Sequence, residues 1–300
     1  MVKTERLGST RVISPVEPGI ISLHYTDRWS AFDRGSSSQL IPGIGAARCA
    51  CAVKSFQLVG NRLPTHFIEQ VGPETIHVQE FSVPDREPLS GKVHGRVLPV
   101  EWIWRDLVYG SLLQRIKNGL DPTTLGFASG ATITEGMKLP NILLECTTKF
   151  EPVDRHLSND EAMALAWITP MQWGDAERLI TDATALTNVY YEAAGFMVPD
   201  GKLELGMARD GSIVLVDVFG TQDENRVIEK TEGDVYSKDL IRNWLNKQPW
   251  KAELVKAKAE YPTNKSKWPP YPELPVDLVE LVSKRYAEVA YRYAGVWVSC

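Results

Sequence analysis

Apolar residues recur at every second position in two short runs of the chain, which is the period of a β-strand. These residues are Leu203 and Leu205 in the first run and Ile213 and Leu215 in the second. Asp210-Gly211 stands between the runs, and this dipeptide favours a two-residue type I′ turn. The stretch from residue 198 to residue 217 is therefore predicted to be a β-hairpin.

A two-residue loop determines which residues face each other across this hairpin. Arg209 pairs with Ser212, and counting back along the ladder places Glu204 opposite Asp217. Opposed carboxylates destabilise paired strands unless a cation or a shared proton offsets the repulsion, and Lys202 lies on the same face. Mg²⁺ takes one or two protein carboxylates plus phosphate oxygens, so the pattern suits a Mg²⁺-nucleotide site. The alternative is a solvated hairpin face with ordinary surface charges.

The rest of the pattern predicts strands first and helices later. Strand-like alternation covers residues 11–13, 20–25, 65–69, 75–79 and 96–104. Helical spacing covers residues 46–59, 174–194 and 236–245, and a capping box at 158–161 begins a further helix. The 174–194 helix is predicted to pack against the hairpin. Loops are expected at 84–95 and 119–140, and a Pro-rich linker at 262–275 precedes a last helix with an apolar stripe.

The change from strands to helices predicts an α+β fold with two lobes. Residues 1–97 form a strand-rich N-terminal lobe, and residues 98–300 form an α/β lobe that includes the C-terminal helices. A chain of 300 residues that is 43% hydrophobic can bury the core of such a fold.

Composition excludes several classes of partner. A net charge of -5 disfavours nucleic-acid binding, although a local basic pocket for a phosphorylated small molecule remains open. No run of about 18 apolar residues and no signal-like N-terminus is present, so we expect a cytoplasmic protein without membrane association. The four cysteines include no CxxC pair, which is typical of reduced thiols.

Two further groups of residues suit phosphate binding. A glycine turn at Gly8, with Ser9 and Arg11 beside it, resembles a hairpin that covers a nucleotide, and an ordinary turn is the alternative. Lys238 and Arg242 are four residues apart on a predicted helix and therefore lie side by side. A solvated helix face is the alternative for this pair.

Several motifs, taken in order, resemble the SAICAR synthetase family, the phosphoribosylaminoimidazole-succinocarboxamide synthases. They are Ser30-Ala-Phe-Asp33, Ile41-Pro-Gly43, Pro64-Thr-His66, Pro99-Val-Glu-Trp-Ile-Trp-Arg105 with Gly110-Ser111, Lys138-Leu-Pro140 with Thr148-Lys149, Asp200-Gly-Lys-Leu-Glu-Leu-Gly206, Asp217 with Asp223 and Arg226, and Ser237-Lys238 with Arg242-Asn-Trp-Leu245. The resemblance covers nearly the whole chain.

This resemblance implies a two-lobed α+β fold, related to protein kinases and ATP-grasp enzymes, with ATP between the lobes. It implies a ligase that activates the carboxylate of an imidazole ribotide as an acyl phosphate and joins it to the amine of aspartate, with ATP and Mg²⁺ as cofactors. Such an enzyme takes a carboxylate substrate and an amino acid as small-molecule partners, and both a monomer and a homo-oligomer remain open.

The resemblance also implies roles for individual residues. The metal would be held by Glu204 and Asp217. The catalytic positions would be Lys202, Arg105 and Asp200. The acid substrate would contact Ser111, Arg226, Lys238, Arg242, Asp223 and Lys149, for which guanidinium forks and a point-charged lysine are suitable anion-binding groups. The nucleotide would contact Gly8, Ser9, Arg11, Val97, Glu101 and Lys202.

The chain departs from the family pattern at four places. Gly8 is followed by Ser9 instead of a basic residue, Ile44 stands where the family has lysine, and Val218 follows Asp217 in place of glutamate. The family segment Pro-Asp-Ser-Ser-Arg is here Gln222-Asp-Glu-Asn-Arg226, which adds Glu224. These changes alter the charge around the substrate pockets.

Three alternatives to the family reaction follow from these departures. The first is a similar ligase of a specialised pathway, acting on another heteroaromatic acid such as a nucleoside-antibiotic precursor. The second is an inactive nucleotide-binding relative, which the retained acid pair and Lys202 disfavour. A kinase is disfavoured because no His-Arg-Asp or Asp-Phe-Gly motif is present.

The cations Lys149, Arg155 and Arg226 favour a dianionic amine donor, such as aspartate, over a neutral one.

Overall fold

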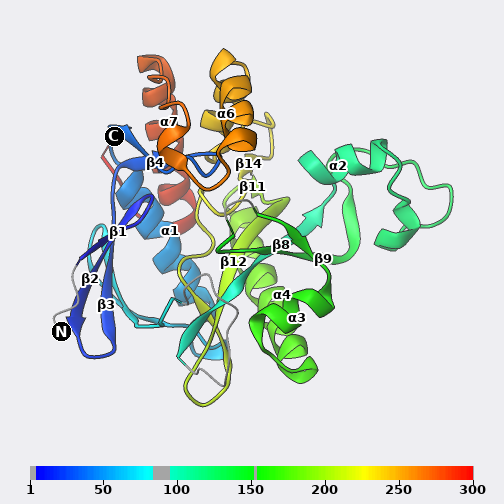
Figure 1. Ribbon diagram of the computed structural model, residues 1–300, viewed down its shortest axis with the longest axis horizontal. Helices are drawn as coiled ribbons and strands as arrows, with labels where there is room; N and C mark the ends of the chain where they lie inside the picture. The colour runs from blue at the N-terminus through cyan, green and yellow to red at the C-terminus, as the bar shows by residue number, and fades with distance from the viewer. Residues whose placement is uncertain (1–4, 84–94, 152–153, 300) are drawn as a thin grey trace.

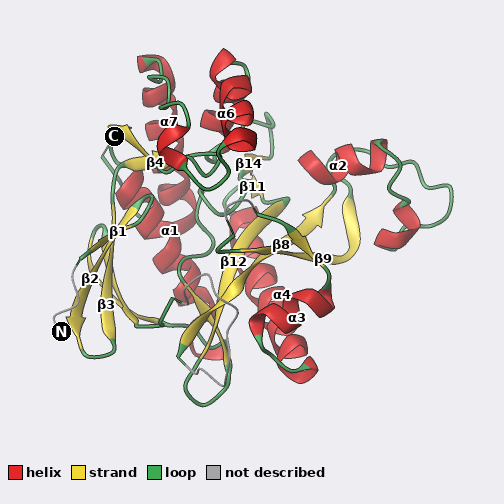
Figure 2. Cartoon of the chain, viewed as in Figure 1, coloured by secondary structure: helices red, strands yellow, loops and turns green. Residues whose placement is uncertain are grey.

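The computed structural model describes residues 5–83, 95–151 and 154–299. Within these ranges the strands form two five-stranded sheets and two smaller two-stranded sheets, with helices around them (Figures 1 and 2). This mixture of helices and antiparallel sheets confirms the predicted α+β class. The loop expected at 84–95 falls almost entirely outside the described residues.

The first five-stranded sheet comes from the N-terminal part of the chain. In spatial order its strands are β1 (Arg6–Leu7), β2 (Arg11–Glu17), β3 (Ile20–Tyr25), β7 (Thr75–Gln79) and β6 (Phe67–Gly72), and all neighbours are antiparallel. The predicted strands at 11–13, 20–25, 65–69 and 75–79 are therefore confirmed with small shifts in their ends. The predicted glycine turn is also present, since the Gly8 N–H donates to the Arg11 carbonyl over 2.8 Å.

The second five-stranded sheet carries the predicted hairpin. Its strands, in spatial order, are β10 (His156–Leu157), β9 (Lys138–Thr148), β8 (Arg96–Leu107), β12 (Asp200–Met207) and β13 (Ile213–Val216), again antiparallel throughout. The strand β9 was not predicted, and its first residues replace the end of the loop expected at 119–140. The two small sheets pair β4 (Arg28–Ser30) with β5 (Ser36–Leu40) and β11 (Phe196–Met197) with β14 (Ile228–Glu229).

The register predicted for the hairpin is wrong by one residue. Glu204 pairs with Val216 rather than with Asp217. The loop holds three residues instead of two: the Ala208 N–H donates to the Ser212 carbonyl over 2.9 Å, and Gly211 adopts the left-handed conformation with φ +89°. Three-residue hairpin loops with glycine in this conformation are common, and they shift the pairing of every residue that follows.

The helices confirm most of the predicted segments. They are α1 (Ile44–Val59), α2 (Gly110–Lys117), α3 (Asn159–Ala166), α4 (Pro170–Ala193), α5 (Asp239–Asn246), α6 (Pro249–Glu260) and α7 (Val276–Val289), with short turns η1 (Gly60–Arg62), η2 (Pro122–Leu125), η3 (Lys265–Lys267) and η4 (Ala290–Ala294). Ser158 forms the predicted capping box with Glu161 at the start of α3. The helix predicted at 236–245 begins only at Asp239, so Lys238 occupies its N-cap position. The helix α6 was not predicted.

The helix α1 links the two parts of the molecule. It contacts β3 and β7 on one side and α4, α7 and η4 on the other, and it stands between the first sheet and the central strands in Figure 1. Its buried residues belong to one continuous apolar core that includes Leu23 of β3, Trp102 of β8 and Val282 of α7. The division into lobes at residues 97 and 98 remains a prediction.

Helix α4 packs against β13 as predicted, and α3 covers β8 and β9 beside it. The described cysteines Cys49, Cys51 and Cys146 are buried free thiols. In the described ranges, no helix combines the length and the apolar character needed to cross a membrane.

Candidate active site

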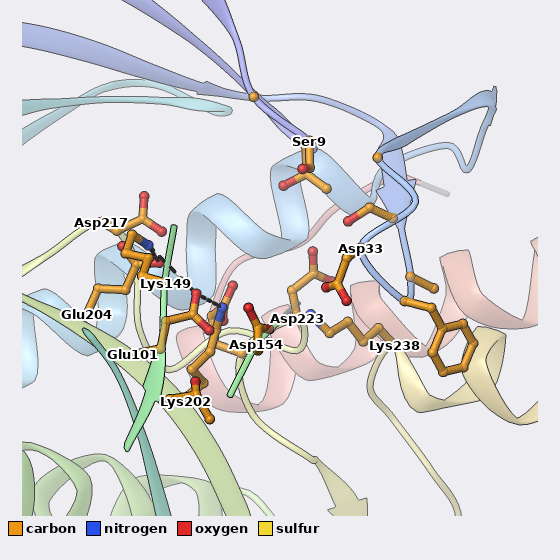
Figure 3. Close-up of a pocket in the computed structure, with 18 of the residues that line it drawn as sticks. Ser9, Asp33, Glu101, Lys149, Asp154, Lys202, Glu204, Asp217, Asp223 and Lys238 are labelled. Atoms are coloured by element: carbon orange, nitrogen blue, oxygen red, sulfur yellow. Dashed lines mark hydrogen bonds and ion pairs between the residues drawn. The ribbon is translucent and has the colours of Figure 1, made fainter. Parts of the chain in front are cut away.

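Two adjoining cavities lie where the first sheet meets the second. The larger, of about 660 Å³, is bounded by the turn at residues 8–11, the segment 30–35 and the inner residues of β8, β9 and β12. The smaller, of about 200 Å³, lies between β8, β12, the loop after β13 and the start of α5. Lys202 and Lys238 line both cavities, so the two spaces adjoin at these side chains. Figure 3 shows both lysines in a close-up of one pocket.

Two carboxylates face each other across the strands at the floor of the larger cavity. Glu204 of β12 pairs directly with Glu101 of β8, and both side chains are more than four-fifths buried. Lys149, the residue directly after β9, forms ion pairs with both acids, and the Lys202 ammonium lies 3.0 Å from Glu101. Opposed like charges destabilise a sheet, so these two lysines are the groups that keep the pair compensated. The predicted pairing of acids therefore exists, with Glu101 instead of Asp217 as the direct partner.

Burial and charge compete at these groups. Burial raises the pKa of Glu204, the Lys149 ammonium opposes this effect, and the Asp217 carboxylate adds to it. Burial alone would lower the pKa of Lys149 and Lys202, but the surrounding carboxylates reverse that effect and raise both values. The lysines therefore stay charged.

Asp217 follows β13 and approaches the same cavity from the other side. Its backbone has φ +61°, a conformation that non-glycine residues adopt only rarely. One Arg11 guanidinium nitrogen lies 2.7 Å from each of its carboxylate oxygens, and its carbonyl lies 2.9 Å from Nε2 of His66. Burial would raise the pKa of Asp217, but Arg11 and two lysines lower it.

His66 is neutral at this position. Burial lowers its pKa to about 4. Since the Asp217 carbonyl can only accept, Nε2 of His66 carries the proton and donates to it. The neighbouring Leu215 N–H donates to the Pro64 carbonyl and the His66 N–H to the Leu215 carbonyl, both over 3.0 Å. The predicted motif at residues 64–66 thus fastens the end of β13 to the first part of the chain.

The acids in the larger cavity suit a divalent cation bound together with phosphate. No group of three or more metal-ligating side chains occurs among the described residues. Mg²⁺ does not require one, because it commonly takes one or two carboxylates and completes its shell with phosphate oxygens and water. Burial is the main cause of the raised pKa of Glu204, and the Asp217 carboxylate adds a repulsion that such a cation would relieve. The residues fit the predicted metal.

In the smaller cavity, Asp200 holds two guanidinium groups. Its carboxylate oxygens lie 3.0 Å from Nε of Arg226 and 3.3 Å from Nη1 of Arg105. Arg105 also donates through Nε to Glu145 over 2.7 Å and is only 6% exposed. These contacts orient both guanidinium groups toward the cavity. Ser111, in the first turn of α2, lines the same space.

Lys238 differs from the other cations of the site. Its ammonium forms no ion pair or hydrogen bond with any residue that the structure describes, and burial lowers its pKa. The adjacent Ser237 hydroxyl is buried and also lacks a hydrogen-bond partner in the described part of the chain. Arg242, one turn later, contacts Asp239 over 3.2 Å and lines both cavities. Lys238 and Ser237 therefore have donors that no described residue uses, with Arg242 beside them, and this group of side chains is suited to bind an anion.

Asp223 lines both cavities but is already paired. Its oxygens lie 2.6 Å from Arg48 Nη1 and 2.8 Å from the Tyr286 hydroxyl. Burial would raise its pKa, but Arg48 and Lys238 lower it to about 2. Arg48 was not predicted as part of the site. The signal was present, because an arginine inside the apolar run of α1 stays buried only when it is paired.

One further acid of the larger cavity was also missed. Asp154 lines it at the exposed rim, and burial together with Asp33 and Glu101 raises its pKa to about 6. Asp33 adopts φ +55° and lies 3.0 Å from Lys258. Figure 3 shows Asp33 and Asp154 on the side of the cavity that also carries Lys238.

Not every predicted site residue faces a cavity. Gly8, Ser9, Arg11 and Glu101 line the larger one, whereas Val97 lines neither and packs with Phe81, Val214 and Val216.

Of the residues that depart from the family pattern, some line a cavity and others do not. Ile44 and Val218 are buried in the core, while Ser9 and Glu224 line the cavities. Ser9 and Glu224 therefore alter the surface that a ligand would meet, and so does Asn225, which lines the smaller cavity.

The three cations from which a dianionic donor was predicted do not form one group. Lys149 pairs with Glu204 in the larger cavity, and Arg226 pairs with Asp200 in the smaller one. Arg155 is half exposed, contacts Glu151 and Glu161, and lines neither cavity. The three cations therefore lie apart, each with a carboxylate partner, and the dianionic donor remains a prediction.

Comparison with known proteins places the chain in a family. The model of the family described as SAICAR synthetase matches residues 7–257. The phosphoribosylaminoimidazole-succinocarboxamide synthase of Thermoplasma acidophilum is 30% identical over 278 residues, which cover 90% of this chain and 92% of that protein. The synthase of Nitrosopumilus maritimus is 25% identical over 297 residues, with 96% and 97% covered.

Solved structures agree with this assignment at the level of the fold. A SAICAR synthetase (Type-2) in complex with ADP has a TM-score of 0.71 at 20% identity, covering 99% of this chain and 100% of that chain. The SAICAR synthase from Saccharomyces cerevisiae complexed with SAICAR has a TM-score of 0.72 at 19% identity, covering 98% and 95%. The fold and the family match together define the class: this chain belongs to the SAICAR synthetase family.

Proposed function

We propose that the protein is an ATP-dependent ligase that joins an imidazole ribotide carboxylate to the amine of aspartate, the reaction of SAICAR synthesis in purine biosynthesis. Family membership supports this reaction over a re-purposed ligase or an inactive relative. The observation that carries the proposal is that two charged cavities adjoin at Lys202 and Lys238. A phosphoryl donor in one and an acid in the other would meet there.

The larger cavity is assigned to the nucleotide. The turn of Gly8 and Ser9 bounds it on one side, and Arg11 stands beside the acid pair with a guanidinium suited to phosphate oxygens. Glu204 and Asp217 would hold Mg²⁺, which supplies charge compensation for the phosphates when bound. Glu101, Lys149 and Lys202 keep the charges around this site balanced.

The smaller cavity is assigned to the acid substrate. Arg105 and Arg226, oriented by Asp200, present guanidinium groups suited to a carboxylate or a phosphate. Ser111, Lys238 and Arg242 offer further donors to the same ligand, while Asp223 stays bound to Arg48 and shapes the wall. Holding two reactants beside each other removes much of the entropic barrier of a bimolecular step.

The chemistry proceeds in two balanced steps. A carboxylate oxygen of the acid forms a bond to the γ-phosphorus as the bond to ADP breaks, and Lys202 at the junction stabilises the charge that develops between them. The uncharged amine then attacks the acyl carbon, phosphate leaves with the former carboxylate oxygen, and the amine loses a proton. Asp154, with its pKa of about 6, is suited to accept that proton near neutral pH.

The amine donor is assigned as aspartate. Aspartate follows from the reaction that names the relatives, since the product of that reaction is a succinocarboxamide. Basic groups at the cavity mouth, namely Arg242 and Lys265, complement a dicarboxylic amino acid.

ADP release and product mass test the reaction together. The purified protein is incubated with Mg-ATP, a panel of heteroaromatic carboxylates and either aspartate or alanine. ADP formation that requires both the acid and aspartate, with a product mass equal to their amide, is the expected result. ADP release without any acid, or preferential incorporation of alanine, would contradict the proposal.

A further inference from the structure

Glu224 occupies the junction of the two cavities without a full set of partners. It lines both cavities, and its side chain is 13% exposed. Its one ion pair joins Oε2 to the Lys202 ammonium at 3.5 Å, and within the described ranges this buried oxygen accepts no hydrogen bond. A buried carboxylate oxygen without a donor is costly, so a group that enters the junction is expected to supply one.

Lys202 gives this carboxylate an ion pair but no hydrogen bond. Its ammonium already has a shorter contact, 3.0 Å to Glu101, and that contact is a hydrogen bond. The backbone of Glu224 is held independently of its side chain, because the Lys202 N–H donates to the Glu224 carbonyl over 2.9 Å. The side chain is therefore fixed at its base, while its carboxylate carries one ion pair and accepts no hydrogen bond at Oε2.

Lys238 is the complementary open group at the same junction. Glu224 and Lys238 both line the two cavities, and Glu224 is the largest charge that opposes the effect of burial on the pKa of Lys238. The other cations of the smaller cavity are already paired with carboxylates, as Arg105 and Arg226 are with Asp200. A ligand that fills this space meets one open cation and one open acceptor.

We propose that Glu224 is a specificity-determining residue: it accepts a hydrogen bond from an amino or hydroxyl group of the acid substrate, next to the anionic group that Lys238 binds. This inference rests on the proposed function in one respect, because that function assigns the smaller cavity to the acid substrate. A ligand that displaces water from the junction must replace the hydrogen bonds that water made. An acid without a donor at this position leaves Glu224 unpaired and binds less well.

Calorimetric binding tests this inference without relying on turnover. The probes are a 5-aminoimidazole ribotide 4-carboxylate and its analogue without the ring amine, each titrated with a non-hydrolysable ATP analogue and Mg²⁺ present. The wild-type protein should bind the amino-bearing acid roughly 10- to 100-fold more tightly than the analogue. Glu224→Ala should bring the two dissociation constants within about threefold of each other.

Two further variants make the result specific. Glu224→Gln keeps an acceptor of the same reach, so it should retain part of the preference. Glu69→Ala removes an exposed acid of β6, outside both cavities, and should retain all of it. The inference is overturned if wild type does not discriminate between the two acids, or if Glu224→Ala weakens both equally. Discrimination without any amide product would instead contradict the proposed reaction and leave the role of Glu224 intact.

Discussion

Glu204 and Glu101 stand directly opposite each other across β12 and β8, with Lys149 in contact with both. The contact turns a destabilising pair of like charges into an alternating row of acids and lysines that ends at Lys202. In this row each carboxylate contacts a lysine, and the last lysine, Lys202, lies where the two cavities meet. The same relationship explains why substitutions here are expected to affect function more than folding.

Replacing Asp217 with asparagine should remove Mg-ATP turnover while leaving the fold intact. In this variant Arg11 loses its carboxylate partner, but the asparagine side chain keeps a carbonyl oxygen that can accept a hydrogen bond from Arg11. Loss of a charge that stabilises the phosphates should lower kcat by at least roughly 100-fold. The measurement is ADP release at several Mg²⁺ concentrations, with the exposed Asp175→Asn on α4 as control. Near-normal turnover of Asp217→Asn at ordinary Mg²⁺ would exclude its role as a ligand.

Replacing Lys238 with alanine should weaken use of the acid substrate. A charge-assisted contact to an anion contributes roughly 1.5–3 kcal/mol, so KM for the acid should rise by about 10- to 100-fold. Lys238→Arg keeps the charge and should recover part of the loss. Steady-state kinetics with acid and ATP varied in turn distinguish the two cavities. A rise in KM for ATP alone would reassign Lys238 to the nucleotide.

His66 should act on the metal site through the backbone of Asp217. Its Nε2–H holds the carbonyl of a residue with positive φ, so its loss should let the Asp217 carboxylate move. His66→Phe should raise the Mg²⁺ concentration needed for half-maximal turnover by roughly 10- to 100-fold. His66→Gln, whose side-chain N–H reaches a similar point, should restore most of the Mg²⁺ affinity. Equal effects of both variants, with unfolding midpoints lowered alike, would indicate a role in stability only.

Asp223 should stabilise the protein in a pH-dependent way. Its folded-state pKa of about 2 lies below the ordinary 3.8, so its contribution is present above pH 3.8 and is lost as the pH falls through 2. The difference corresponds to about 2 kcal/mol at pH 7 and to about half of that at pH 3. Urea unfolding of wild type and Asp223→Asn at both pH values measures it. A difference in unfolding free energy that stays constant down to pH 3 would contradict the assignment.

Local patterns predicted most elements of the fold, because their signals lie within a few residues. The capping box at Ser158 and the apolar face of α4 are of this kind. The hairpin itself was also predicted, but its register was not. Asp210-Gly211 is compatible with loops of two and of three residues. The difference of one residue in loop length decides whether Glu204 faces Asp217 or Val216.

The site was predicted through motifs, but its connections depend on long-range geometry. The partner of Asp223 is Arg48, 175 positions earlier in the chain, and the opposed acid Glu101 lies on a strand paired through tertiary structure. The positions of the three cations behind the predicted amine donor depend on the same long-range geometry. Lys149, Arg155 and Arg226 are all present in the sequence, yet each is already bound to a different carboxylate.

The transfer of an oxygen atom from acid to phosphate tests the proposed reaction most directly. The acid is prepared with ¹⁸O in its carboxylate and converted with Mg-ATP and aspartate, and the phosphate is analysed by mass spectrometry. If the carboxylate attacks the γ-phosphorus, each phosphate released should carry one ¹⁸O and the amide should keep the other. Unlabelled phosphate, or the label in AMP, would contradict activation through an acyl phosphate.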